Sequence, residues 1–186
     1  MSLGFILIQL LGLVPSVIAF TSLQTGNRKR ILALMLFCNI MWLAHYMLLN
    51  AYAGVMINVV GLLRAVLCYN NDKKWAESSG WELLLILLYI GGAVLTWEGP
   101  LSALPAISMI LTTIGLWTHD MRKTRMLFLL NSPPLILYNI MIHSYSCFFI
   151  ECCAFISYII AVYRFDVKKY KVKALAKQKE DILTEE

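Results

Sequence analysis

Long apolar runs make up most of this chain, and short polar segments separate them. Each run has about 20 residues, which is enough for a helix to cross a bilayer core of roughly 30 Å. The pattern therefore predicts an all-α integral membrane protein with seven transmembrane helices. The expected spans are 3–21, 31–50, 51–69, 81–97, 101–118, 126–143 and 145–163.

The composition agrees with this pattern. Of the 186 residues, 60% are hydrophobic and only 15% are charged, which is far more apolar than an ordinary soluble domain. The connections between the spans are too short to form a domain outside the membrane. We expect the first run to remain as a helix rather than to be cleaved as a signal peptide. Met1 to Gly4 carries no basic side chain, and no small-x-small cleavage site ends the run.

The basic residues predict the orientation, since Lys and Arg in short loops remain on the cytoplasmic side. They follow the first, third, fifth and seventh runs and are missing from the loops after the second, fourth and sixth. The N-terminus should therefore face outward and the C-terminus the cytoplasm, and the net charge of +5 reflects this topology. No basic patch is interleaved with exposed aromatic residues, so nucleic acid is not an expected partner.

The sequence lacks the motifs of common catalytic and metal sites. Its five cysteines all fall within expected spans, lack the paired C-x-x-C spacing of metal or redox sites, and are expected to pack in the apolar interior. There is no glycine loop of a phosphate site and no nucleophile with a positioned base. The sequence thus predicts neither an enzyme nor a bound cofactor.

A shift of 93 positions superimposes the first three runs on the last three. The basic loops then coincide, Lys29-Arg30 with Arg122-Lys123, and Asn58 meets Glu151. Both copies run in the same direction because one further span lies between them, an arrangement that some transporters use around a central solute. The expected division is 1–69 for a first triple-helix bundle, 70–98 for a linker with the fourth helix, 99–164 for a second triple-helix bundle and 165–186 for a charged cytoplasmic tail.

Prolines lie inside several expected spans. Pro15 is in the middle of the first span, Pro105 is early in the fifth, and Pro133 is in the middle of the sixth. Each removes a helical hydrogen bond and tends to bend its helix, so these residues are candidate hinges of a gate. Proline is also common in membrane helices without such a role, and the sequence leaves both interpretations open.

Ionisable groups inside hydrocarbon are costly and usually mark a functional site. Asn58 and Glu151 occupy matching positions in the repeat and are the leading candidates to face each other across a central cavity. An amide and a carboxyl can together donate and accept hydrogen bonds, which suits a polar solute with hydroxyls or amines. The alternative is that both only join helices, which contributes on the order of 0.6 kcal/mol per bond in membranes.

Further candidates for the solute site lie toward the outer ends of the second and sixth spans. His45 and Asn139 are expected to line the outer half of the cavity, with Trp42 one turn inward from His45. Tyr138, which the repeat matches to His45, is assigned to the same site. For His45, a structural bond to a neighbouring helix is an equal alternative.

One charged residue, Arg64, interrupts the apolar run INVVGLLRAVL of the third expected span. It lies about 9 Å of helical rise from Asn58, on the cytoplasmic half of the span. Either the long side chain extends its charge to the inner interface, or it closes the cytoplasmic side of the cavity as part of a gate. The sequence leaves these two roles open.

Two pairs of polar residues at fixed spacings, and one short motif at the end of the last run, form a recognisable pattern. His45 lies 19 residues before Arg64 in AHYMLLNAYAGVMINVVGLLRA, and Asn139 lies 12 residues before Glu151 in YNIMIHSYSCFFIE. The segment YRF, residues 163–165, closes the last run. In these features the chain resembles the YgjV-type bacterial inner-membrane proteins, a group that resembles the SWEET and PQ-loop membrane proteins.

The resemblance implies two triple-helix bundles joined by a linker helix, an outward N-terminus, and transport of a small solute by alternating access. SWEET-like proteins carry sugars, and an asparagine in the third helix of each bundle contacts the solute. That role falls on Asn58 and, less faithfully, on Glu151. Neither Pro15 nor Pro105 is followed by glutamine, so the proline-glutamine pair of PQ-loop proteins is missing.

The favoured hypothesis is a facilitator or proton-coupled carrier of a small polar solute, with sugars among the candidates, in the bacterial inner membrane. The alternative is a membrane receptor or partner-binding protein whose polar residues only pack helices. Its candidate surface is the tail, residues 165–186, although a polybasic segment beside a span more often contacts anionic lipid. The expected partners are the solute, the bilayer and anionic lipid at the tail, and the sequence leaves the oligomeric state open.

Overall fold

The structure is a computed structural model that describes residues 3–22, 28–70, 73–76, 78–118 and 120–167. Within these ranges the chain forms seven α-helices and no β-strand. Each helix overlaps one expected span, so the predicted all-α class with seven helices is confirmed, and three helical segments of the described residues meet the length and hydropathy of a membrane span. The elements are α1 (Leu3–Ser22), α2 (Arg28–Leu48), α3 (Tyr52–Tyr69), α4 (Ser79–Leu95), the 3₁₀ turn η1 (Pro100–Ser102), α5 (Ala103–Trp117), α6 (Met121–Met141), α7 (Tyr145–Val162) and the π-helical turn η2 (Tyr163–Val167).

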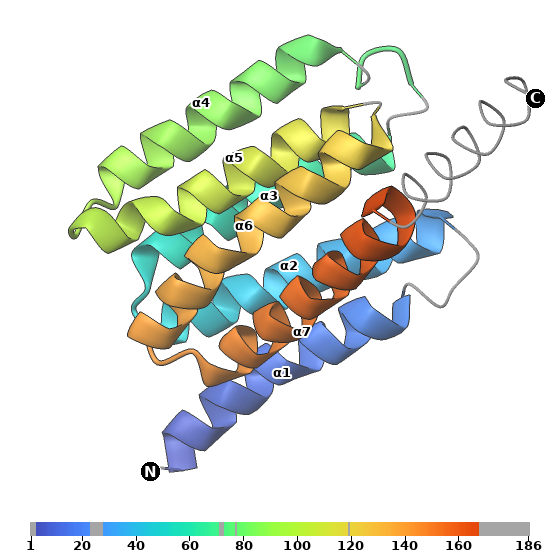
Figure 1. Cartoon of the computed structure of the whole chain (residues 1–186). Coiled ribbons are helices and arrows are strands. Elements are labelled where there is room, and N and C mark those ends of the chain that lie inside the picture. Colours follow the sequence, from blue (N-terminus) through green and yellow to red (C-terminus); the bar gives the residue numbers. More distant parts are fainter. Residues whose placement is uncertain (1–2, 23–27, 71–72, 77, 119, 168–186) are drawn as a thin grey trace, which may run out of the picture.

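The helices form two layers. In one layer α1, α2 and α3 lie side by side in chain order, and in the other α5, α6 and α7 do the same (Figure 1). Contacts between α1 and α7 and between α3 and α5 join the layers at both edges, while α4 packs against α3 and α5. The layers therefore enclose an interior to which every helix except α4 is adjacent.

The two layers repeat the same local geometry 93 residues apart. Adding 93 to the bounds of α2 and α3 gives the bounds of α6 and α7. Asn50 and His143, in the turns that follow α2 and α6, both adopt the left-handed conformation, with φ of 56° and 58°. In each turn the next residue donates its N–H to the carbonyl oxygen five residues earlier, at 3.0 Å and 2.9 Å. A left-handed residue of this kind ends a helix by satisfying its last carbonyl groups.

Short polar side chains set the start of two helices. Ser78 Oγ accepts a hydrogen bond from the Gly80 N–H at 3.3 Å before α4, and Asp120 Oδ1 accepts one from the Arg122 N–H at 2.9 Å before α6. These caps satisfy N–H groups that a helix start leaves unpaired. Both helices thus begin where a polar loop residue can serve as the cap.

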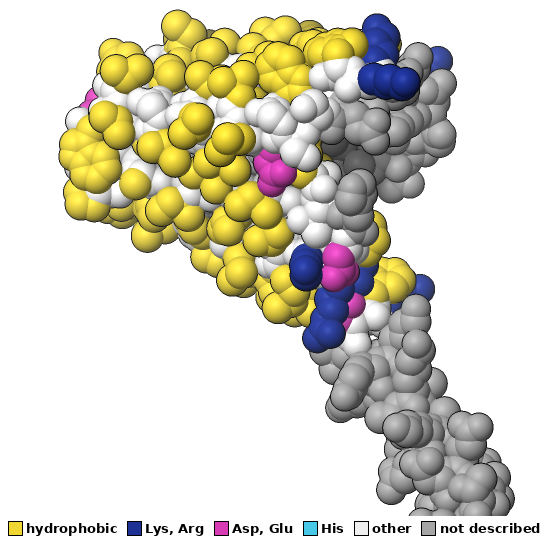
Figure 2. All heavy atoms as spheres, turned by 90° about the horizontal axis from the view of Figure 1, so that it is seen from above, with side chains coloured by type: hydrophobic (Ala, Val, Ile, Leu, Met, Phe, Trp, Pro, Cys, Tyr) yellow, Lys and Arg dark blue, Asp and Glu magenta, His cyan; other side chains and the backbone are white. Residues whose placement is uncertain are grey.

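The outer surface is largely apolar. On α4, Val94 and Leu95 are 68% and 82% exposed, and hydrophobic side chains cover much of the face shown in Figure 2. Exposed apolar surface on this scale is typical of contact with lipid. Among the described residues, the helical segments long and apolar enough to cross a membrane are Tyr52–Tyr69, Pro100–Trp117 and Tyr145–Asp166. Shorter apolar stretches lie in α1, α2 and α4.

Basic side chains gather at one end of the molecule, on the right in Figure 2. At this end Arg125 Nε and Nη2 donate to the two carboxylate oxygens of Asp166 at 2.9 Å and 2.7 Å. The pair joins the start of α6 to η2, which contains the YRF segment. Most of the tail expected to contact lipid or a partner, residues 168–186, lies outside the described residues.

Candidate polar cavity between the two helix layers

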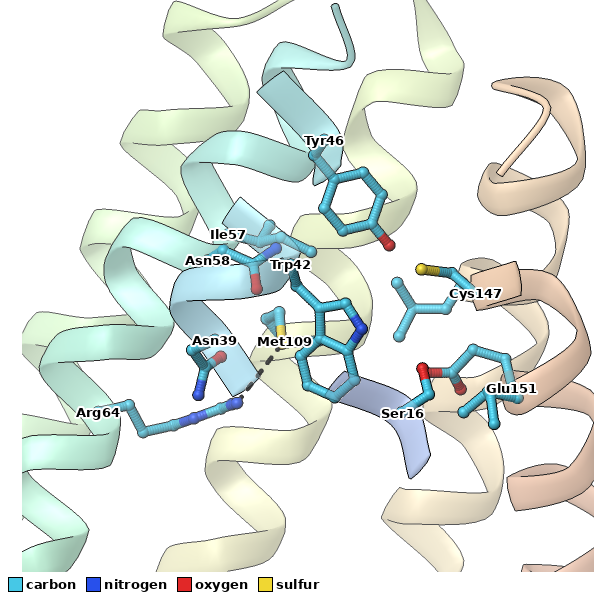
Figure 3. A pocket seen from close by; sticks show the side chains of 12 residues that line it. Ser16, Asn39, Trp42, Tyr46, Ile57, Asn58, Arg64, Met109, Cys147 and Glu151 are labelled. Atoms are coloured by element: carbon cyan, nitrogen blue, oxygen red, sulfur yellow. Dashed lines mark hydrogen bonds between the residues drawn. The ribbon is translucent and has the colours of Figure 1, made fainter. Parts of the chain in front are cut away.

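A cavity of about 110 Å³ lies between the two layers (Figure 3). Residues from α1, α2 and α3 line one part of it, and residues from α5, α6 and α7 line the rest. No residue of α4 contributes to the lining. The lining residues are Ser16, Asn39, Trp42, Tyr46, Ile57, Asn58, Arg64, Met109, Leu135, Cys147, Ile150 and Glu151.

The lining follows the internal repeat. Eight of the lining residues form four pairs whose members are 93 positions apart. The pairs are Ser16 with Met109, Trp42 with Leu135, Ile57 with Ile150, and Asn58 with Glu151. Equivalent helix faces of the two layers therefore meet at this cavity.

Helical periodicity explains which side chains reach the cavity. On α2 the lining residues Asn39, Trp42 and Tyr46 are three and then four positions apart, which places them on one helix face. On α7, Cys147 and Glu151 are four positions apart and share a face in the same way. Each layer thus presents one continuous stripe of its helices to the cavity.

Asn58 and Glu151 lie where the repeat predicts them, on α3 and α7 at the cavity wall. In Figure 3 they lie on opposite sides of Trp42. The side-chain amide of Asn58 donates to the carbonyl oxygen of Gly54 at 2.8 Å, which leaves its own oxygen as an acceptor. Among the described residues, nothing forms a hydrogen bond with the Glu151 carboxyl, and Figure 3 shows this side chain beside Ser16.

Arg64 extends from α3 across to α5. Its Nη1 lies 3.4 Å from Thr113 Oγ1 and its Nη2 lies 3.6 Å from Met109 Sδ. The guanidinium therefore lines the cavity and bonds two neutral groups of α5, and no carboxylate of the described residues forms an ion pair with it. Arg64 thus lies at the cavity wall, and its role as part of a gate stays a prediction.

The other polar candidates, His45, Tyr138 and Asn139, are fully buried but do not line the cavity. They bond across the layers at the end where the α2–α3 and α6–α7 turns lie. Tyr46 donates its hydroxyl to Asn139 Oδ1 at 2.9 Å, and the Gly54 N–H donates to the Tyr138 hydroxyl at 2.9 Å. Tyr46 also lines the cavity, so its bond to Asn139 lies at this end of the cavity wall.

Two further groups extend this network to α1. His45 Nδ1 bonds the carbonyl oxygen of Ile8 at 2.8 Å, and its Nε2 bonds Ser144 Oγ at 2.8 Å. A carbonyl oxygen only accepts, so Nδ1 is the donor in the first bond. The Gln9 amide donates to the carbonyl oxygen of His143 at 2.8 Å. We call these bonds, together with those of Tyr46 and Tyr138, the turn-end network; all of them except the His45–Ile8 bond join the two layers.

The three prolines occupy different environments. Pro15 is buried beside the cavity residue Ser16, and its carbonyl oxygen accepts from Cys38 Sγ at 3.2 Å. Pro105 lies in the first turn of α5, where a helix leaves its N–H groups unpaired. Because η1 runs directly into α5, the expected loss of a helical hydrogen bond at Pro105 stays a prediction. Pro133 lies inside α6 on an exposed position, away from the cavity.

Eight of the lining residues were not among the predicted site residues, namely Ser16, Asn39, Tyr46, Ile57, Met109, Leu135, Cys147 and Ile150. The repeat offers one signal for them, since Ser16 and Met109 are equivalent positions. Helical spacing offers another, because Asn39 and Tyr46 share a face with Trp42. In the part of the chain that the structure describes, no group of three His, Cys, Asp or Glu side chains is placed to hold a metal ion.

The apolar outer surface and the polar interior define an integral membrane protein whose helices surround a cavity. The chain belongs to the Imp-YgjV family, described as bacterial inner membrane protein, and the family model matches residues 6–169. The resemblance to the YgjV-type group is therefore confirmed, as is the assignment to the bacterial inner membrane. Comparisons with curated proteins and with solved structures gave no match.

Close contact in the turn-end network predicts a strong effect of adding one methyl group at Gly54. A Cβ there would lie 2.6 Å from the ring of Tyr46, which is buried and bonded to Asn139. We expect Gly54→Ala to lower the free energy of unfolding by about 1–3 kcal/mol through overpacking, measured by thermal unfolding in detergent. The control is Gly91→Ala on α4, where a Cβ meets no atom within 4 Å. That variant should be neutral or stabilising by about 0.5–1 kcal/mol, and equal losses for both would contradict the prediction.

Proposed function

We propose that this protein is a multi-pass transporter of a small polar solute that works by alternating access. The two moving bodies are a bundle of α1, α2 and α3 and a bundle of α5, α6 and α7, with α4 as the linker helix. The observation that carries the proposal is the cavity between the layers, whose wall includes four pairs of residues at equivalent positions of the repeat.

A site between repeats suits alternating access for a geometric reason. Transporters built from parallel repeats hold the solute between their halves, near the middle of the membrane. Rocking of the halves then opens the same site to one side or the other. The SWEET-like proteins that the sequence resembles are of this kind, and a relation to them is part of the proposal.

The turn-end network supports a state that is closed on one side. Its hydrogen bonds join α2 to α6, α3 to α6, and α2 to Ser144, the residue before α7, at the end away from the basic residues. By the distribution of Lys and Arg, that end faces outward. In this proposal the network is the outer gate, and Arg64 belongs to the opposite, cytoplasmic side of the cavity.

The chemistry of the wall favours a polar solute. Asn58, Arg64 and Glu151 supply hydrogen-bond acceptors, donors and ionisable groups, and Trp42 and Tyr46 supply aromatic surface. Such groups are expensive inside a membrane and are retained chiefly where they contact a substrate or an ion. An interior that served only to pack helices would not need them beside a cavity.

Uptake into liposomes tests the transport proposal. Liposomes with the purified protein should take up at least one solute from a panel of labelled sugars, amino acids, carboxylates and amines faster than protein-free liposomes. Asn58→Ala should reduce that uptake at least tenfold because it removes a polar group of the cavity wall. The control is Asn70→Ala, which removes a side chain that bonds only the Val66 carbonyl oxygen at the end of α3. No uptake of any solute by correctly folded protein would contradict the proposal.

Proton coupling predicts a specific change in the pH dependence of uptake. Glu151 is the acidic group of the cavity, and the other titratable side chains near it are Tyr46, Cys147, Cys152 and Tyr158. If the carboxyl carries the coupled proton, Glu151→Gln should give a flat pH profile where the parent has a sloping one. Glu82→Gln, an acid at the start of α4, should keep the parent profile. Identical profiles for Glu151→Gln and the parent would leave a facilitator without proton coupling.

Loss of a single gate bond should open the outer side measurably. Tyr46→Phe removes the hydroxyl that bonds Asn139, and a bond of about 0.6 kcal/mol corresponds to about a threefold change in the closed-to-open equilibrium. In a cysteine-free variant that carries Ser16→Cys at the cavity wall, an impermeant maleimide added outside should react about three times faster. Tyr163→Phe, at the exposed η2 position, is the control. Unchanged labelling in Tyr46→Phe would remove the turn-end network as a gate.

A further inference from the structure

We propose that the cavity binds a small zwitterion, a molecule with one anionic and one cationic group, such as a small amino acid. The proposal deepens the transport function above and rests on it, because it names the solute class for the same cavity. It is based on the two charged side chains of the wall and on the size of the cavity.

Arg64 and Glu151 place opposite charges at the cavity without pairing them with each other. The ion pair among the described residues joins Arg125 to Asp166 at 2.7 Å and lies outside the cavity. The contacts of Arg64, at 3.4 Å and 3.6 Å, are with a hydroxyl and a thioether. A charge-assisted bond to a carboxylate would be about 2.7–2.9 Å, so both groups retain unused capacity for a ligand.

A zwitterion complements these groups in a way that a neutral solute does not. Its carboxylate can accept two parallel hydrogen bonds from the planar guanidinium of Arg64. Its ammonium can donate to Glu151 and lie against the indole of Trp42, which lies between the two charged groups in Figure 3. Buried charges are costly unless they are paired, so a bound zwitterion stabilises both ends of the cavity together.

The two charged side chains of the cavity occupy different positions of the repeat. Glu151 corresponds to Asn58 in the other copy, and Arg64 corresponds to Ser157. Each charge is therefore present in one copy only, although the helix faces that carry them are equivalent. A wall with one cation and one anion suits a ligand with unlike ends.

The cavity volume limits the size of the ligand. A cavity of about 150 Å³ in another protein holds benzene, with its six carbon atoms. The cavity here has about 110 Å³, which is of the same order and suits a ligand of about six non-hydrogen atoms, as in alanine, better than a hexose with about twelve. Size and charge thus both favour a small amino acid over a sugar.

Matched ligands test the inference by thermal unfolding of the full-length protein in detergent. One set is L-alanine with propionate and ethylamine, the second is 4-aminobutyrate with butyrate and butylamine, and glycerol and glucose are the neutral solutes. At saturation, one of the two amino acids should raise the Tm by about 5 °C or more. The acid and the amine of its set, each lacking one charge, should give less than half of that shift.

Charge-removing variants provide an independent measurement. Arg64→Gln and Glu151→Gln should each raise the Kd of the amino acid at least tenfold. Arg64→Gln should retain the weak effect of the amine, and Glu151→Gln that of the acid. Lys73→Gln and Glu82→Gln, both outside the cavity, should bind as the parent does. If a variant fails to fold, the comparison of matched ligands on the parent still decides.

Each other outcome has a definite meaning. Stabilisation by glycerol or glucose and not by an amino acid would overturn the zwitterion and leave the transport proposal intact. An acid or amine that binds as tightly as the amino acid would also overturn it, and so would a panel without any shift. An amino acid that raises the Tm but does not enter proteoliposomes would support the binding inference and contradict transport.

Discussion

Inside hydrocarbon no water is present to satisfy a polar group, so each buried donor or acceptor needs a partner within the protein or a ligand. The interior of this protein meets that requirement in two ways. At the turn end, Tyr46 bonds Asn139 and the Gly54 N–H bonds Tyr138, so the polar groups of one layer satisfy those of the other. At the cavity, Glu151 has no such partner among the described residues. The need to satisfy buried polar groups therefore joins the layers at the turn end. At the cavity wall it leaves one carboxyl that has no hydrogen-bond partner among the described residues.

The internal repeat determines where both regions form. Tyr46 and Asn139 are equivalent positions, 93 residues apart, and they bond to each other. A contact between equivalent positions lies close to the axis that relates the two copies. The cavity is also built from equivalent pairs, so it lies near the same axis. This placement brings the turn-end network and the cavity together at the boundary between the layers.

Small differences between the copies give the cavity its chemistry. The copies agree in helix bounds and in the left-handed turns at Asn50 and His143, which are properties of the backbone. They differ where Asn58 corresponds to Glu151 and where Arg64 corresponds to Ser157. The backbone repeat therefore supplies a nearly symmetric framework, and the side chains make it asymmetric. The result is a cavity with a cationic region and an anionic region rather than two equal halves.

The sequence by itself determined the helices, because an apolar run of bilayer length has no other stable form in a membrane. It also determined the 93-residue repeat and, through the rarity of charge in such runs, the importance of Arg64 and Glu151. Which side chains face inward was decided only by the tertiary structure. The lipid-facing side of a membrane helix is as apolar as its packed side, so hydrophobic periodicity does not separate the two. His45 and Asn139 therefore looked like cavity residues, and only the packing of α2 against α1 and α6 places them in the turn-end network instead.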